Sequence, residues 1–157
     1  MAACTGAILI VEDCADDAKS LETVLQQVGI RNPIEVVHGV NHAMARLNHA
    51  TSLADPASAS PVSVILLDLK LPGRDGFQLL DWLNLQPELN GILVVVVSGL
   101  DDLVSIRRAY ALGADSFLTK PCSAADLENL IHWFPQFWDR ISIPVLAVPG
   151  TYPIGAT

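Results

Sequence analysis

An apolar run that ends in a carboxylate is the feature that most constrains how this chain can fold. The run from Val62 to Leu67 is almost wholly apolar, and Asp68 follows it directly, ahead of a loop with Pro72 and Gly73. An apolar strand of this kind is typical of a parallel sheet buried on both faces. Open α/β sheets bind their ligands beyond the carboxyl ends of the strands, so Asp68 is expected at a binding edge.

Short apolar segments alternate with segments of helical periodicity along the rest of the chain. The other expected strands are Ala7 to Val11, Ile34 to Val37, Ile92 to Val97 and Ser116 to Thr119. The expected helices are Asp16 to Val28, Asn41 to about Leu53, Asp75 or Gly76 to about Leu85, Asp101 to Gly113, and Ser123 to about Phe137. Asn41 and Ser123 are expected caps, and Asp126 completes a capping box with Ser123. We therefore predict an α/β fold with a doubly wound, five-stranded parallel sheet. The order 2-1-3-4-5 is taken from known folds of this kind, not from the sequence.

Charged and polar side chains follow several of these strands. Glu12 and Asp13 follow the first strand, Ser98 the fourth and Lys120 the fifth, so all are expected near Asp68. Crowded carboxylates raise one another's pKa values, and a divalent cation relieves that cost. Mg²⁺ prefers oxygen ligands such as carboxylates and phosphates, and a lysine supplies a charge for a phosphate. The set indicates a magnesium-assisted phosphoryl acceptor with Asp68 as nucleophile.

Four ordered segments resemble the response-regulator receiver family. They are Ile10 to Asp13, Leu66 to Gly76, Val97 to Gly99 and Phe117 to Pro121, within a match over about residues 6 to 137. Each segment alone is weakly specific, whereas the ordered set is highly specific. The resemblance implies a flavodoxin-like fold. It also implies a phosphoacceptor that gains and loses its phosphoryl group by its own chemistry and is not a classical enzyme.

The resemblance also assigns roles to single residues. It implies that Asp68 takes the phosphoryl group from a kinase phosphohistidine. It implies that Asp13, Asp68 and the backbone carbonyl of Lys70 ligate Mg²⁺, with Glu12 acting largely through water. Lys120, the Ser98 hydroxyl and the backbone N–H groups of Lys70 and Gly99 would then hold the phosphoryl oxygens.

A switch pair is implied as well. In this family the position of Ser98 is coupled to an aromatic residue on the fifth strand, which here is Phe117. Phosphorylation would draw the Ser98 hydroxyl toward the phosphate, and Phe117 would turn into the vacated space. Phe117 departs from the more usual Tyr and has no hydroxyl, so the output would rest on packing. Simple core filling by Phe117 is the alternative.

A finer resemblance concerns the partner kinase. The stretch Cys14 to Asp17 and the pair Phe137-Trp138 are similar to small stand-alone receivers of phytochrome-type or hybrid histidine kinases. We divide the chain into a receiver domain, 1–140, and a proline-containing tail, 141–157, with no output domain. Asp16 and Asp17 are expected to be helix-start residues rather than metal ligands.

Composition narrows the class of partner. The formal net charge is −8, from 9 Lys and Arg against 17 Asp and Glu, which argues against direct DNA binding. The apolar runs are too short to cross a bilayer, and no secretory signal is expected. The odd number of cysteines, 3, indicates reduced thiols and a cytoplasmic protein. The expected partners are a sensor histidine kinase, a downstream protein and, at the fifth strand and last helix or the tail, a second copy.

Two rival functions remain open on sequence alone. The first is a phosphatase with an aspartyl nucleophile, which usually carries a second acid two residues later. Lys70 stands at that position and cannot serve as that acid. The second is a receiver-like binding module that needs no phosphorylation, against which the complete set of acids, serine and lysine argues.

Overall fold

The computed structural model describes residues 6–51 and 61–133, and within them a single parallel sheet carries the helices. Its strands are β1 (Ala7–Val11), β2 (Ile34–Val37), β3 (Val62–Leu67), β4 (Leu93–Ser98) and β5 (Ser116–Thr119). Their order is β2-β1-β3-β4-β5, with every neighbouring pair parallel. This is the predicted doubly wound order, in which successive strands are added on one side of β1 and then, from β3 onward, on its other side.

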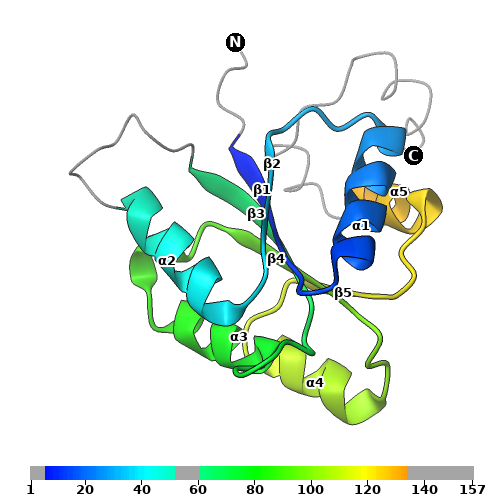
Figure 1. The fold of residues 1–157 in the computed structure, drawn as a ribbon. Coiled ribbons are helices and arrows are strands. Elements are labelled where there is room, and N and C mark those ends of the chain that lie inside the picture. The colour runs from blue at the N-terminus through cyan, green and yellow to red at the C-terminus, as the bar shows by residue number, and fades with distance from the viewer. Residues whose placement is uncertain (1–5, 52–60, 134–157) are drawn as a thin grey trace.

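The helices cover both faces of the sheet (Figure 1). They are α1 (Ala15–Val28), α2 (Val40–Thr51), α3 (Gly76–Asn84), α4 (Leu103–Ala111) and α5 (Ala124–Trp133), with a short 3₁₀ turn η1 (Pro87–Leu89). α1 and α5 pack together on one face, while α2, α3 and α4 lie side by side on the other. Every connection therefore crosses the sheet through a helix, as parallel strands require.

Alternate residues of the central strands feed two separate cores. Ile8 and Ile10 of β1 face α1 and α5, whereas Leu9 and Val11 face α2, α3 and α4. All of β1 is buried, which explains why its sequence shows no polar alternation. Burial on both faces makes β1, β3 and β4 a rigid base, and their carboxyl ends become the natural place for an ordered cluster of polar groups.

The helix ends show where local sequence rules hold. Ser123 and Asp126 exchange hydrogen bonds of 3.1 and 3.0 Å, so the predicted capping box is confirmed. Asp102 caps α4 by accepting from the backbone N–H of Ser105 at 2.9 Å. The prediction that Asn41 caps α2 was wrong, because the helix already begins at Val40. The side chain of Asn41 instead accepts a 2.9 Å hydrogen bond from Arg74.

Other predicted boundaries shift by one or two residues. β4 begins at Leu93 and extends through Ser98, so Ser98 is the last residue of the strand rather than the first beyond it. α4 begins at Leu103, after the two acidic residues. The predicted end of the last helix at Phe137, the residue Trp138 and the tail 141–157 lie outside the described residues.

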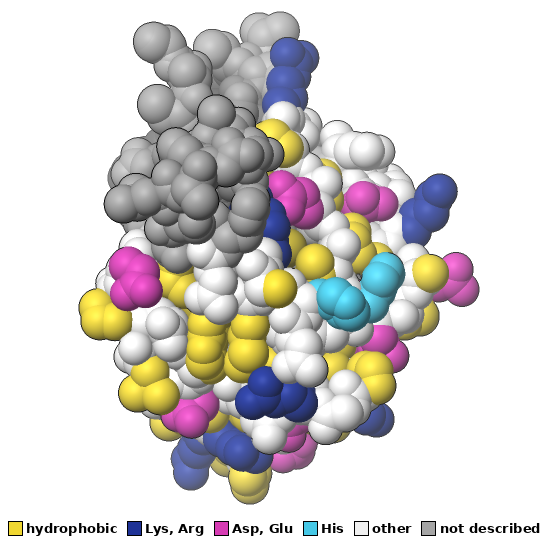
Figure 2. Space-filling view, turned by 60° about the vertical axis from the view of Figure 1, so that its left-hand side comes forward, with side chains coloured by type: hydrophobic (Ala, Val, Ile, Leu, Met, Phe, Trp, Pro, Cys, Tyr) yellow, Lys and Arg dark blue, Asp and Glu magenta, His cyan; other side chains and the backbone are white. Residues whose placement is uncertain are grey.

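The surface mixes charges of both signs. Figure 2 shows basic side chains scattered among acidic, neutral and apolar ones on the face in view. The larger apolar side chains exposed in the described residues include Leu85, Leu103, Val104 and Tyr110. Within the same residues, no helix is both long and apolar enough to span a bilayer.

Candidate functional site

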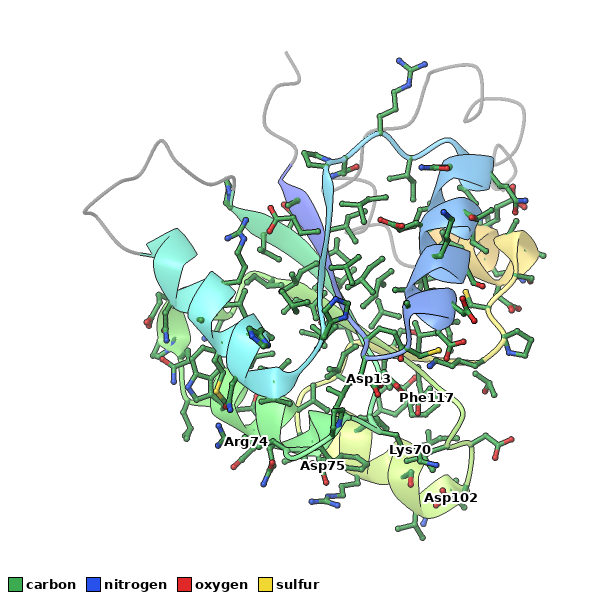
Figure 3. The ribbon with its side chains drawn as sticks, in the orientation of Figure 1. Asp13, Lys70, Arg74, Asp75, Asp102 and Phe117 are labelled. Carbon is green, nitrogen blue, oxygen red and sulfur yellow. The ribbon has the colours of Figure 1, made fainter. Side chains whose placement is uncertain are left out.

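Backbone pairing brings the ends of β1, β2 and β3 into line. The N–H of Glu12 donates to the carbonyl of Val37 at 2.9 Å, and the N–H of Asp68 donates to the carbonyl of Val11 at 3.0 Å. Both acids therefore emerge at the same level of the sheet, one residue beyond buried strands. Figure 3 shows the labelled Asp13 and Lys70 at this carboxyl edge, with Arg74 and Asp75 on the loop that leads into α3.

Glu12, Asp13 and Asp68 form a compact group of carboxylates. One oxygen from each lies within 4.8 Å of the other two. Glu12 is 1% exposed and Asp68 6% exposed, whereas Asp13 faces solvent. Burial raises the pKa of Glu12, and the charge of Asp68 adds to that rise, although hydrogen bonds from Lys120 and Cys14 oppose it. The arrangement is costly without a cation, which makes it chemically suited to one.

Lys120 supplies a cation from the far edge of the sheet. Its Nζ lies 2.6 Å from Oε1 of Glu12, 2.7 Å from Oδ2 of Asp17 and 3.4 Å from Oδ2 of Asp68. Burial alone would lower the pKa of Lys120, but hydrogen bonds to Asp17 and Glu12 and the charge of Asp68 raise it overall. Lys120 is therefore a firmly charged ammonium beside the carboxylate of Asp68.

The loop after Asp68 packs closely against the start of α3. The backbone N–H of Lys70 donates to Oδ1 of Asp68 at 3.3 Å. Gly76 begins α3 directly against this loop, and a Cβ there would lie 2.5 Å from the carbonyl oxygen of Asp68. The N–H of Gly76 donates to the carbonyl of Leu69 at 2.8 Å, which fixes the loop to the first turn of α3.

Ser98 and Phe117 occupy neighbouring strands. Ser98 is fully buried, and its hydroxyl oxygen accepts from the N–H of Leu100 at 3.2 Å. The carbonyl of Ser98 accepts from the N–H of Lys120 at 3.0 Å, which ties the ends of β4 and β5. Phe117 is half-buried and packs with the core beneath α2, α3 and α4. Core filling thus accounts for its present contacts.

The structure brings together most of the predicted site and adds one residue. Lys120 pairs with both Glu12 and Asp68, Asp13 joins the carboxylate group, and the Lys70 N–H donates to Asp68. Asp17, expected only to start a helix, is a direct partner of Lys120. These two residues are 103 positions apart, so only the folded chain reveals the pair.

Two hollows flank the acidic group. One, of about 340 Å³, lies between α1 and the end of β5 and is lined by Asp17, Ser20, Leu21, Val97, Lys120, Pro121 and Cys122. The other, of about 430 Å³, lies over the loop after β3 and is lined by Asp13, Leu69, Lys70, Leu71, Pro72, Asp75, Phe77 and Leu100. Lys120 lines the first hollow and Asp13 the second, whereas Asp68 lines neither and lies buried between them.

A doubly wound sheet with acids and a lysine at its carboxyl edge defines a class of phosphoryl-accepting signalling domain. The family model for the response regulator receiver domain matches residues 8–132. The chain therefore belongs to the response-regulator receiver family and is a response regulator of two-component signal transduction.

Two relatives match this chain over most of their own length. It is 30% identical over 138 residues to response regulator Rcp1 of a Synechocystis species, covering 87% of this chain and 92% of Rcp1. It is also 30% identical over 131 residues to the probable methanogenesis regulatory protein FilR2 of Methanothrix harundinacea, covering 83% of this chain and 82% of FilR2.

The similar solved structures are also response regulators. The bacteriophytochrome response regulator AtBRR is 29% identical with a TM-score of 0.72, covering 85% of this chain and 95% of AtBRR. The phosphorylated cyanobacterial phytochrome response regulator RcpA is 28% identical with a TM-score of 0.67, covering 89% and 99%. The Mn²⁺-bound form of Rcp1 is 27% identical with a TM-score of 0.67 and the same coverage.

Proposed function

We propose that Asp68 accepts a phosphoryl group from the phosphohistidine of a sensor histidine kinase. The observation that carries this proposal is the 3.4 Å approach of the Lys120 ammonium to the Asp68 carboxylate, beside two further acids. An oxygen of Asp68 forms a bond to phosphorus as the phosphorus–nitrogen bond of the donor breaks. The imidazole leaves with the electron pair and takes up a proton.

We further propose that the carboxylates hold Mg²⁺. The donors are hard oxygens, and their mutual spacing of at most 4.8 Å fits ligands around one ion. Asp13, Asp68 and the backbone carbonyl of Lys70 would hold the ion, with Glu12 acting through water. When bound, Mg²⁺ neutralises charge on the transferring phosphoryl oxygens. The relative Rcp1 has been solved in a Mn²⁺-bound form, which supports the proposal of a divalent ion in this chain.

The remaining phosphoryl oxygens would be held by this chain's own donors. Lys120 contributes its charge, Ser98 its hydroxyl, and Lys70 and Gly99 their backbone N–H groups. The Lys70 N–H already points to Oδ1 of Asp68 at 3.3 Å, which supports its role. Water would later cleave the acyl phosphate, release inorganic phosphate and restore the carboxylate. On this proposal the protein turns its own signal off and is not a classical enzyme.

Output would come from repacking around Ser98 and Phe117. Ser98 is completely buried, so a movement of its hydroxyl toward a phosphoryl group would leave a space that neighbouring side chains must fill. Phe117, half-buried on the adjacent strand, would turn toward the vacated space. The surface formed by α4, β5 and α5 would then change its affinity for a downstream protein.

The partner kinase is proposed to be of the phytochrome or hybrid type. This rests on the likeness to the phytochrome response regulator RcpA and the bacteriophytochrome response regulator AtBRR.

We also propose a stand-alone receiver, 1–140, with its tail at 141–157, acting in a bacterial cytoplasm. A homodimer through β5 and α5 or the tail remains part of the proposal. Light scattering on a chain truncated before Ile143 tests the tail version, which an unchanged mass would exclude.

The phosphoacceptor assignment is tested by labelling with acetyl phosphate and Mg²⁺. Mass spectrometry of the wild type should show one added phosphoryl group, and Asp68→Asn should show none. Asp101→Asn removes one exposed carboxylate just beyond the site and serves as the matched control, with labelling retained. Labelling of Asp68→Asn at the wild-type stoichiometry would exclude Asp68. Steady turnover of a small phosphate ester would instead revive the phosphatase alternative.

A further inference from the structure

Asp17 forms an ion pair with Lys120 at the edge of the acidic cluster. It stands in the first turn of α1, and its Oδ2 lies 2.7 Å from Nζ of Lys120, closer than the 3.4 Å from Nζ to Asp68. The side chain of Asp17 is 46% exposed and lines the 340 Å³ hollow between α1 and the end of β5. Glu12, 1% exposed, holds the same ammonium at 2.6 Å from inside.

Asp17 and Asp68 compete for the ammonium group of Lys120. A lysine ammonium has three N–H donors, so the position of Nζ, and not the number of donors, limits what each carboxylate receives. The distances of 2.6 and 2.7 Å show that Glu12 and Asp17 each receive one at short range, whereas Asp68 at 3.4 Å lies beyond a good hydrogen bond. Nζ thus stands closer to Oδ2 of Asp17 than to Oδ2 of Asp68. A doubly charged phosphoryl group on Asp68 would attract the same ammonium more strongly than the carboxylate does.

We propose that Asp17 is a positioning residue that holds Lys120 back from Asp68 in the unphosphorylated protein and is partly released when Asp68 is modified. The inference rests on the proposed function of Asp68. It predicts that the Asp17 contact lowers the affinity of the site for a phosphoryl group, because part of that contact must be given up. A purely structural tie between α1 and β5 predicts the reverse, because its loss would disorder Lys120.

Beryllofluoride, a stable mimic of a phosphoryl group on a carboxylate, provides the probe. Its binding is titrated by calorimetry at saturating Mg²⁺ for wild type, Asp17→Asn and Asp16→Asn. Asp16 is the matched control: it is the preceding residue, it is exposed, and it is not among the ion-pair partners of Lys120 in the described residues. Both variants lose one negative charge in the same helical turn, so long-range effects are equal.

Asp17→Asn should bind beryllofluoride about two- to fivefold more tightly than Asp16→Asn, the range expected for a partly exposed ion pair. Asp17→Glu, which keeps the carboxylate, should return toward the wild-type affinity. In a Lys120→Gln background, Asp17→Asn should have no effect, because the residue acts only through the lysine.

Equal or weaker binding by Asp17→Asn overturns the inference while leaving the phosphoacceptor proposal intact. An effect of Asp17→Asn that persists without Lys120 overturns it as well. Failure of the wild type to bind beryllofluoride at all overturns the proposed function, and the inference with it. Thermal unfolding of each variant without ligand separates loss of folding from loss of affinity.

Discussion

At the scale of single residues, Lys120 offsets the charge repulsion within the acidic cluster. It faces Glu12, Asp17 and Asp68 at once, and it carries the only positive charge paired with them in the described residues. Removing it leaves a buried carboxylate, Glu12, without its charged partner. An unpaired buried carboxylate lowers the free energy of unfolding.

Lys120→Gln should therefore destabilise the metal-free protein by about 1–3 kcal/mol. Urea unfolding in the presence of EDTA measures this. Added Mg²⁺ should recover part of the loss in the variant, because the ion takes over the neutralising role. Equal unfolding free energies for wild type and Lys120→Gln in EDTA would show that the cluster needs no cation.

Cys122 is a second residue whose environment sets its chemistry. Burial, helped by the charge of Asp126, raises the pKa of Cys122 to about 11. At pH 8 only about one thiol in a thousand is then ionised, and the thiolate is the reactive form. The raised pKa favours folding below the ordinary thiol pKa, and this contribution is lost as pH rises toward 11.

We expect iodoacetamide to alkylate Cys122 at least about tenfold more slowly than the exposed Cys14 at pH 8. Peptide mapping by mass spectrometry measures both rates in one sample. In urea the two rates should converge, since unfolding removes the burial. Faster reaction of Cys122 than of Cys14 in the folded protein would contradict the assigned environment.

How much of the site can be predicted from sequence depends on where its partners come from. The placement of Asp13, Asp68, Ser98 and Lys120 at one edge was predictable because each ends or closely follows a recognisable strand, and strand ends converge there. The contact of Asp17 was not, because the first turn of a helix explains an acidic residue equally well. Only the approach of Lys120 from a strand 103 residues away distinguishes the two roles.

At the scale of elements, the start of α3 is packed against the loop that carries Asp68. Gly76 leaves no room for a side chain there, since a Cβ would stand 2.5 Å from the Asp68 carbonyl oxygen and 2.8 Å from Cα of Leu69. Both obstacles are backbone atoms, which cannot rotate away. The loop or the helix would have to move as a unit.

Gly76→Ala should lower the unfolding free energy by about 1–3 kcal/mol, the usual cost of overpacking, and should also reduce labelling by acetyl phosphate. Gly91→Ala is the control, because a Cβ there meets nothing within 4 Å. Urea unfolding and phosphoryl labelling of both variants give the test. Normal stability of Gly76→Ala would mean that the loop can yield without cost.

Element boundaries follow from sequence where one force dominates. The strands β1, β3 and β4 were placed to within a residue because their apolar runs are buried on both faces. The predicted cap at Asn41 failed, because a polar side chain near a helix start suits a cap and an outside partner equally well. The structure gives Asn41 the outside partner, Arg74, on the loop before α3.

At the scale of the whole molecule, binding at the sheet edge should stabilise the entire fold. The site draws on β1, β3, β4, β5 and α1, and the same strands supply both cores. A ligand that binds only the folded state adds about 2.7 kcal/mol when its free concentration is 100 times its Kd. For a domain of this size each kcal/mol shifts the Tm by about 2–4 °C, so a rise of roughly 5–10 °C is expected.

Beryllofluoride with Mg²⁺ should therefore raise the Tm of the wild type by that amount in a thermal scan at constant protein concentration. Asp101→Asn should show the same rise, and Asp68→Asn little or none, because the oxygen that bonds beryllium is missing. An equal rise in Asp68→Asn would locate the ligand elsewhere on the protein. A rise with Mg²⁺ alone that Asp13→Asn removes would separate the metal's share of the stabilisation from that of the phosphoryl mimic.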